Sequence, residues 1–324
     1  MANYRTLKGF DVKVVSSDPS PTFTGQMWYN STDHKLRVAK NVGAWSAGGD
    51  VNNARGRSGN AGTQTASILA AGYSFSTSSN LDASEEYNGS AWSEGNEVNT
   101  AGRQNSCFGI QTAAVLAGRY TSTAVSNVEE YNGTSWSEVE DLPNEGKFGL
   151  ASAGTLTAGL AWGGYILSPD TKVAETLEYD GTDWTDTSDT NATKQYAMGM
   201  GTQTAGLSAG GEGPATDQSE EYNGTGWTEG NNLNTARGNG GGAGTQTAGL
   251  IFGGVGEVGS TTVEDYDGTT WSTGTAMSIT REGHHGCGTN TAALAASGTV
   301  TNNSNPANTE EYTFAAGTQD VTSS

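Results

Sequence analysis

The chain has 324 residues, two cysteines and a formal net charge of −20. Such an acidic protein does not bind nucleic acid or an anionic membrane through bulk charge, because both require a basic surface. No stretch approaches 18 consecutive apolar residues, and charges interrupt the first 15 positions, so we expect neither a membrane span nor a signal peptide.

The N-terminal part differs from the rest in charge. Residues 1–57 hold eight Lys and Arg against four Asp and Glu, a net charge of +4, which leaves −24 for the remainder. Residues 10–15 read as a strand, and Pro19 and Pro21 then form a stiff break. We therefore predict an attachment arm at residues 1–25. The positive charge of residues 1–57 predicts docking on an acidic neighbour, such as another subunit, and the alternative is that the charge reflects only a solvated acidic surface on the remainder.

Tryptophans recur along the chain at intervals of 43 to 48 residues. They are Trp45, Trp92, Trp136, Trp184, Trp227 and Trp271. A period of this size marks an array of supersecondary units, each of which is stable only when stacked on its neighbours. We therefore expect one array, although the length alone suggests two domains.

Each unit repeats the same features in the same order. A Gly-Thr-Gln-Thr-Ala turn at residues 62–66, 201–205 and 244–248 precedes a short apolar run. An acidic segment then ends in a tyrosine, at Tyr87, Tyr131, Tyr179, Tyr222, Tyr266 and Tyr312. In five units Asn-Gly or Asp-Gly follows at once, and the tryptophan comes three residues after the glycine.

These features predict four short antiparallel strands in each unit and no helix. Asn-Gly and Asp-Gly favour a type I′ hairpin between the Tyr and Trp strands, because both central residues need positive φ. No 3.6-residue period persists, and Gly and Thr are frequent throughout. Four strands in roughly 45 residues are typical of a β-propeller blade.

The two chain ends complement each other. The last Tyr segment, at Tyr312, has no tryptophan after it, and Trp45 has no complete blade before it. Pairing of residues 44–46 with residues 310–312 would close the ring and leave no open sheet edge. We predict an all-β, six-bladed propeller over residues 26–314, with residues 26–50 completing the sixth blade, and a C-terminal tail at residues 315–324.

The repeated aromatic and basic residues are predicted to be structural. The Tyr and Trp residues should pack between blades, and carbohydrate stacking is expected only for aromatics in longer loops, such as Tyr120 or Tyr165. One basic residue opens each unit, at Arg55, Arg103, Lys147, Lys194, Arg237 and Arg281. We expect each to pair with the acidic segment of an adjacent blade, and the alternative is a central basic ring that binds a ligand.

No residue is assigned to catalysis, a cofactor or a metal. His34, His284 and His285 are too few for a copper oxidase, and the adjacent pair would point to opposite faces of a strand. Single carboxylates spread around a propeller are too dispersed for a calcium site. Cys107 and Cys287 fall in the first strands of blades that are not neighbours, so we expect free, buried thiols.

Two resemblances follow from these motifs. Double glycines after an apolar strand, at residues 163–164, 210–211 and 253–254, together with the Tyr, the Trp and the basic residue, resemble kelch-repeat propellers over about residues 27–314. That fold hosts both enzymes and binding modules. Residues 25–37, Gly-Gln-Met-Trp-Tyr-Asn-Ser-Thr-Asp-His-Lys-Leu-Arg, resemble a hairpin motif of bacteriophage virion and tail-fibre proteins. The Ala/Gly/Thr/Ser/Asn-rich composition is similar to that of marine phage virion proteins.

The resemblances imply a non-enzymatic structural protein located in the virion, as a tail, fibre or decoration component. The arm would bind other virion proteins within a homo-oligomeric assembly. Loops at residues 74–80, 165–172, 211–218 and 300–307 vary between units, and we expect them to contact a host-surface glycan or receptor. The alternative is a glycan-binding lectin or a sialidase-like glycosidase propeller.

Overall fold

A computed structural model describes residues 12–19, 26–212, 216–255, 260–300 and 304–321. These residues contain strands and no helix, and hence no helix that could cross a membrane. The chain forms two compact units, one of residues up to Ala44 and from Thr313 onward, the other of Trp45–Tyr312. Each unit is described by itself.

The smaller unit contains β1 (Lys13–Val15), β2 (Met27–Asn30) and the adjoining parts of β3 (Lys35–Ala47) and β28 (Thr309–Asp320). β1 is parallel to β2, and β2 forms an antiparallel hairpin with β3. The Asp18 carboxylate accepts hydrogen bonds from the indole of buried Trp28 at 2.8 Å, from Asn30 at 2.9 Å and from Arg37. This network fixes the hairpin that residues 25–37 were expected to form.

The unit boundaries differ from the predicted domain boundaries. Residues 26–44, expected in the sixth blade, belong to the smaller unit because they pair with β1 and with the end of β28. The expected tail at residues 315–324 continues as β28 to residue 320. Of the expected arm at residues 1–25, residues 1–11 and 20–25 lie outside the described residues.

The larger unit consists of small antiparallel sheets, with strands placed in chain order in each sheet. The first two sheets are β4 (Gly59–Thr63), β5 (Ala66–Ser74), β6 (Ser79–Tyr87) and β7 (Trp92–Glu94), then β8 (Ser106–Ile110), β9 (Ala113–Tyr120), β10 (Ala124–Tyr131) and β11 (Trp136–Glu138). The third is β12 (Ala151–Thr155), β13 (Ala158–Trp162), β16 (Thr176–Tyr179) and β17 (Trp184–Asp186), with the separate hairpin β14 (Tyr165–Leu167) and β15 (Asp170–Lys172).

The chain continues through two further four-stranded sheets. They are β18 (Met198–Thr202), β19 (Ala205–Ala209), β20 (Ser219–Tyr222) and β21 (Trp227–Glu229), then β22 (Gly241–Thr245), β23 (Ala248–Phe252), β24 (Val263–Tyr266) and β25 (Trp271–Thr273). The last sheet contains β26 (Gly286–Thr289), β27 (Ala292–Ala296) and β28, and β3 is hydrogen-bonded beside β28.

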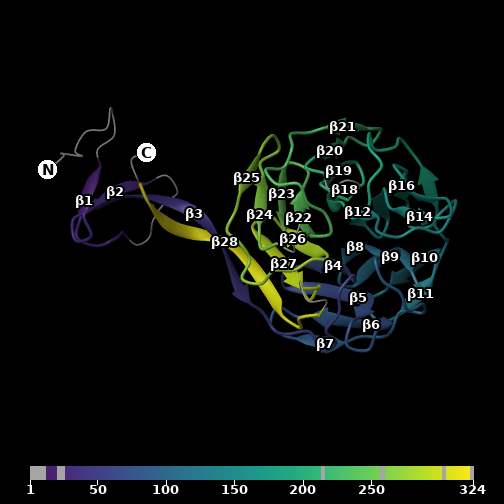
Figure 1. Ribbon diagram of the computed structural model, residues 1–324. Coiled ribbons are helices and arrows are strands. Elements are labelled where there is room, and N and C mark those ends of the chain that lie inside the picture. The colour runs from purple at the N-terminus through teal and green to yellow at the C-terminus, as the bar shows by residue number, and fades with distance from the viewer. Residues whose placement is uncertain (1–11, 20–25, 213–215, 256–259, 301–303, 322–324) are drawn as a thin grey trace. The chain divides into compact units, whose positions relative to one another are not determined.

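The sheets of the larger unit lie around a common centre, as in a β-propeller (Figure 1). The first strand of each sheet lies innermost and contacts the first strand of the next, from β4 through β8, β12, β18 and β22 to β26, which contacts β4. The second strands carry apolar runs such as Ile68–Ala71 that are fully buried, because neighbouring sheets cover both faces.

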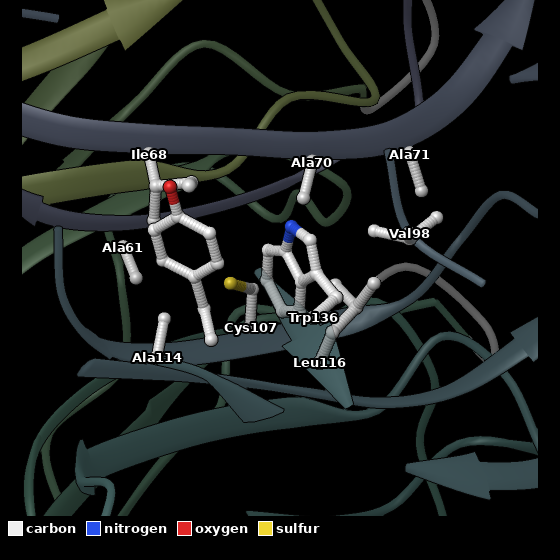
Figure 2. Close-up of a cluster of buried hydrophobic side chains, with 10 residues drawn as sticks. Ala61, Ile68, Ala70, Ala71, Val98, Cys107, Ala114, Leu116 and Trp136 are labelled. Atoms are coloured by element: carbon white, nitrogen blue, oxygen red, sulfur yellow. The ribbon is translucent and has the colours of Figure 1, made fainter. Parts of the chain in front are cut away.

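The hydrophobic core is divided into clusters between adjacent sheets. In one cluster, Ile68 and Ala70 of β5 pack against Leu116 of β9 and Trp136 of β11 (Figure 2). Five of the repeat tyrosines face the tryptophan across their hairpin, as Tyr87 faces Trp92 with ring centroids 4.9 Å apart. The aromatic pair thus fills the space between one sheet and the next.

The hairpins between Tyr and Trp are present, but the predicted type I′ turn is wrong. Tyr87 pairs with Trp92, so four residues form the loop, and of these only Gly89 has positive φ. The Asn88 carboxamide oxygen accepts the backbone N–H groups of Ser90 and Ala91, both at 3.0 Å. The side chain of the Asn or Asp therefore replaces the backbone turn that Asn-Gly predicts.

Candidate functional site

Five of the six predicted basic residues are buried in ion pairs and cannot bind a ligand. Each pairs with a glutamate of its own sheet: Arg55 with Glu85, Lys147 with Glu175, Lys194 with Glu220 at 2.6 Å, Arg237 with Glu264, and Arg281 with Glu310 at 2.9 Å. The expected pairing with an adjacent blade is therefore wrong. The reason is that the strand carrying each glutamate, or in the case of Glu175 directly following it, lies two places outward from the strand that the basic residue precedes.

The glutamates also bind the loops that lead into the first strand of their sheet. Glu85 accepts the backbone N–H groups of Asn52 at 2.7 Å and Asn53 at 3.0 Å, and Glu264 accepts that of Asn234 at 2.7 Å. Arginine, glutamate and loop therefore form one buried polar unit in which the charges are neutralised. The acidic segments contribute to the framework and do not form a ligand site.

Arg103 is the exception, because Arg119 replaces it in the ion pair of its sheet. Arg119 contacts Glu129 at 2.8 Å, and both side chains are fully buried. Gly102 occupies the position of Arg55, and a side chain there would meet the Arg119 side chain at 2.7 Å. Arg119 occupies the position at which other units have the second residue of the double glycine. This difference is the sequence signal that could have shown that Arg119, and not Arg103, pairs with the glutamate.

The mouth of the central channel is formed by one residue from each sheet. These are Arg57, Gln104, Gly149, Tyr196, Asn239 and Gly283, all in the left-handed region with φ between 55° and 68°. Each backbone N–H donates to the carbonyl of the preceding member, and Arg57 donates to Gly283, so the hydrogen bonds form a closed cycle. The distances of the other five bonds are 2.7 to 2.8 Å.

The positive φ angles at the mouth favour a functional site there. A non-glycine residue with positive φ is uncommon, and such residues concentrate at functional sites held by the surrounding structure. Four members of the mouth carry side chains, and the amide of Gln104 donates to the Tyr196 hydroxyl across it. The sequence gives no common residue type at these positions, and none of the four was predicted.

The cavities at the mouth are small. A cavity of about 20 Å³ at the mouth is lined by Arg57, Gln104, Tyr196 and His285. A second cavity of about 40 Å³ lies among the inner strands, between Asn60 and Gly242. These two cavities each hold a water molecule or two and no sugar ring, so ligand contact at this end takes place on the surface around the mouth. A larger cavity of about 110 Å³ lies further along the same inner strands, where glycines such as Gly62 and Gly201 line it.

Several groups at the mouth have shifted pKa values. Burial raises the pKa of Glu212, and the nearby Glu282 raises it further, against the opposing effect of Lys172 and Arg57. Burial and Glu212 also raise the pKa of Tyr196. Exclusion of water lowers the pKa of His285 to about 4, so this imidazole is neutral at neutral pH. Perturbed groups that gather at one opening favour a functional site there.

A continuous run of aromatic rings borders the mouth, which we call the aromatic arc. It consists of Phe75, Tyr73, Tyr120, Phe148 and Tyr165, with neighbouring centroids 5.0 to 5.5 Å apart except where Arg103 separates Tyr73 from Tyr120. The Arg103 guanidinium lies 4.4 Å from the centroid of one tyrosine and 4.6 Å from the other. Arg57 lies over Phe75 at 5.6 Å.

The arc comes from the segments where three sheets are extended by longer hairpins. Two of the expected contact loops, at residues 74–80 and 165–172, contribute Phe75 and Tyr165 to it. Residues 213–215 and 301–303 of the other two expected loops lie outside the described residues. Tyr120 and Tyr165, the aromatics expected to be available for stacking, are partly exposed members of the arc.

The remaining predicted chemical groups take no part in the mouth. Cys107 and Cys287 are free and buried, as expected, and burial raises the pKa of both thiols. His284 is buried against Phe252, and burial lowers its pKa. Within the described ranges no three His, Cys, Asp or Glu residues are placed to hold a metal ion.

Comparisons with known proteins agree on the fold. No family model matches the sequence, and no curated protein matches it. The solved structure of YjhT is similar, with a TM-score of 0.70 and 13% sequence identity, over 83% of this chain and 99% of that chain. At this identity the likeness shows a β-propeller fold and nothing about activity.

Proposed function

We propose that the larger unit is a six-bladed, kelch-like propeller whose last blade is completed by Trp45–Ala47 of β3. The placement of β3 beside β28 supports this arrangement. Trp45 packs on Tyr312 with centroids 5.1 Å apart, in the way that Trp92 packs on Tyr87. The closed cycle of backbone hydrogen bonds at the mouth, with one member from each sheet, gives independent support.

We propose that the chain is a non-enzymatic virion structural protein, in a tail, fibre or decoration component, that presents the propeller for binding. The observation that carries the binding role is that most charged side chains of the repeat are buried in ion pairs, whereas a few are not. The repeated Arg, Lys and Glu residues are buried in structural ion pairs. The partly exposed side chains that are available to contact a ligand gather at the aromatic arc and the mouth. The placement in a phage rests on the resemblance of residues 25–37.

Attachment to the particle is assigned to the smaller unit. Its hairpin lies in a sheet made from both ends of the chain, and among the residues that the structure describes β1 forms the edge of that sheet, with Val14 exposed. An unpaired strand edge is a ready surface for another protein. We propose other virion proteins, within a homo-oligomeric assembly, as the partners of this unit.

A glycan-binding or glycosidase propeller is the second candidate. Glu212 and Glu282 lie close enough at the mouth for one carboxylate to raise the pKa of the other, which is the pattern of an acid–base pair. The buried ion pairs count against the sialidase-like version, because the basic ring that would bind a carboxylate at the centre is already neutralised.

Two measurements separate these functions. Mass spectrometry of purified particles of the encoding phage should detect the chain at a stoichiometric level, and its absence would remove the virion role. Incubation with a panel of bacterial surface polysaccharides should show binding without release of reducing ends. Release that is abolished by Glu212→Gln and retained by Glu311→Gln, a framework control, would establish the glycosidase instead.

A further inference from the structure

We propose that the aromatic arc, with Arg57 and Arg103, binds an acidic polysaccharide, a chain of pyranose rings that carry carboxylates. This inference rests on the proposed binding function and names the class of ligand.

The two arginines are distinguished from all others in the larger unit. Arg55, Arg119, Arg237 and Arg281 each contact a buried glutamate. Among the described residues of this unit, Arg57 and Arg103 are the arginines that form no ion pair, and both are partly exposed. Of the carboxylates at the mouth, Glu212 interacts with Arg57 electrostatically but forms no ion pair with it. Two guanidiniums without an ion pair, in a protein with a net charge of −20, point to an anionic ligand.

The surface around them is extended, not pocketed. The arc runs across three successive sheets, from Phe75 to Tyr165, and the cavity beside it is about 20 Å³. A single sugar cannot enter that cavity, whereas a polymer can lie along the arc with several residues in contact. Four of the five arc residues are partly exposed, whereas Phe148 is buried. The exposed rings can bury the apolar faces of sugar residues at little cost in conformational entropy, since each side chain has two torsions.

The order of the groups matches a polymer that alternates apolar faces with anionic groups. Arg103 lies between Tyr73 and Tyr120, and Arg57 lies over Phe75, so each cation is flanked by a ring. The aromatic faces hold the guanidiniums in place by cation–π attraction. Arg103 Nη1 also donates to the Asn80 carboxamide oxygen at 3.2 Å and its Nε is buried, so Nη2 of Arg103 and the guanidinium of Arg57 are left to donate to a carboxylate. Neutral sugars would use the rings alone and would gain nothing from the two charges.

The test uses the full-length protein with hexagalacturonate as the probe and its methyl ester as the uncharged counterpart. Isothermal titration calorimetry should show binding of the acid, weakened about tenfold or more by esterification. Arg103→Gln and Arg57→Gln should each cause a similar loss, and Tyr120→Ala should weaken binding as well. Thr134→Asp, in an exposed turn between β10 and β11, changes the net charge by the same amount as Arg→Gln and should have no effect.

Three outcomes would overturn the inference: no binding of the acid, equal binding of acid and ester, or equal affinities of wild type and both arginine variants. The comparison of acid and ester uses only the wild-type protein, so the inference stays testable if a variant misfolds. Failure here leaves the detection of the chain in particles, and its binding to other surface polysaccharides, as separate results, so the proposed function does not fall with it.

Discussion

The hydroxyl of Tyr87 donates a hydrogen bond of 2.5 Å to the carboxylate of Glu311, and so joins β6 to β28. The same bond connects other neighbouring sheets: Tyr131 to Glu86, Tyr179 to Glu130, Tyr222 to Glu178 and Tyr266 to Glu221, at 2.5 to 2.8 Å. In each pair the tyrosine belongs to the later sheet. Tyr87 and Glu311 reverse that order, because here the first sheet meets the last.

Tyr87→Phe should therefore destabilise the protein as much as Tyr131→Phe does. Each variant removes one charge-assisted hydrogen bond and leaves a carboxylate with fewer partners, a loss of about 1.5–3 kcal/mol. Urea unfolding followed by tryptophan fluorescence would measure both. If Tyr87→Phe has no effect while Tyr131→Phe is destabilising, the seam between the first and last sheets does not contribute to stability.

Alkaline pH should unfold the protein through these tyrosines. Burial and the bond to Glu311 raise the pKa of Tyr87 to about 12, burial raises that of Tyr312 to about 12, and burial together with Glu86 raises that of Tyr131. Because the folded-state pKa is higher than the ordinary 10, this stabilisation is complete below pH 10 and is lost as the pH rises through 12. The free energy of unfolding should thus fall between pH 10 and 12.

Phenolate absorbance near 295 nm gives an independent measurement. The buried tyrosines should ionise only with unfolding, so that part of the absorbance change coincides with the loss of structure. If all twelve tyrosines of the chain titrate near pH 10 in the folded protein, the buried Tyr–Glu bonds are absent in solution.

Arg119→Met should be far more harmful to stability than Arg103→Met, although the repeat aligns Arg103 with the framework cations. Removal of one member of a buried ion pair leaves the charge of Glu129 uncompensated, at a cost of about 3–5 kcal/mol. Arg103 has no such partner. Urea unfolding would measure both variants, and equal effects of the two would contradict the assignment of Arg119.

Gln246→Leu should loosen the contact between two adjacent sheets. The Gln246 amide donates to the carbonyl oxygens of Tyr222 at 2.7 Å and Gly206 at 3.0 Å, both in the preceding sheet. Loss of the two bonds should cost about 1–3 kcal/mol, which thermal unfolding would detect. Thr247→Ala, in the same exposed turn, is the control, and an equal effect there would mean that the turn, not the amide, stabilises the contact.

The glutamine explains why Gly-Thr-Gln-Thr recurs. Gln64, Gln111 and Gln203 make the equivalent pair of bonds to a repeat tyrosine carbonyl and a second carbonyl of the preceding sheet. In the third sheet the position is Leu156, which instead packs on an apolar cluster. The motif was recognised as a turn from the sequence, but its role between sheets depends on which sheet lies beside it.

The sequence by itself determined the parts that local chemistry repeats. Tyr–Trp spacing and turn glycines predicted the strands and the absence of helix, because each depends on residues close in the chain. The turn type was missed because the Asn88 side chain competes with the backbone for the same N–H groups. Local signals specified the hairpin but not its hydrogen bonding.

The tertiary structure alone decided which charges are available. Arg103 and Arg119 are 16 positions apart, and it is Arg119 that reaches Glu129. Arg119 fits there because Gly102 has no side chain to occupy the same space. Arg57, Gln104, Tyr196 and Asn239 share a backbone conformation and no side-chain type, so no pattern in the chain marks them. The arc and the mouth form only when separate sheets are brought side by side, because their contacts join residues that the sequence places in different repeats.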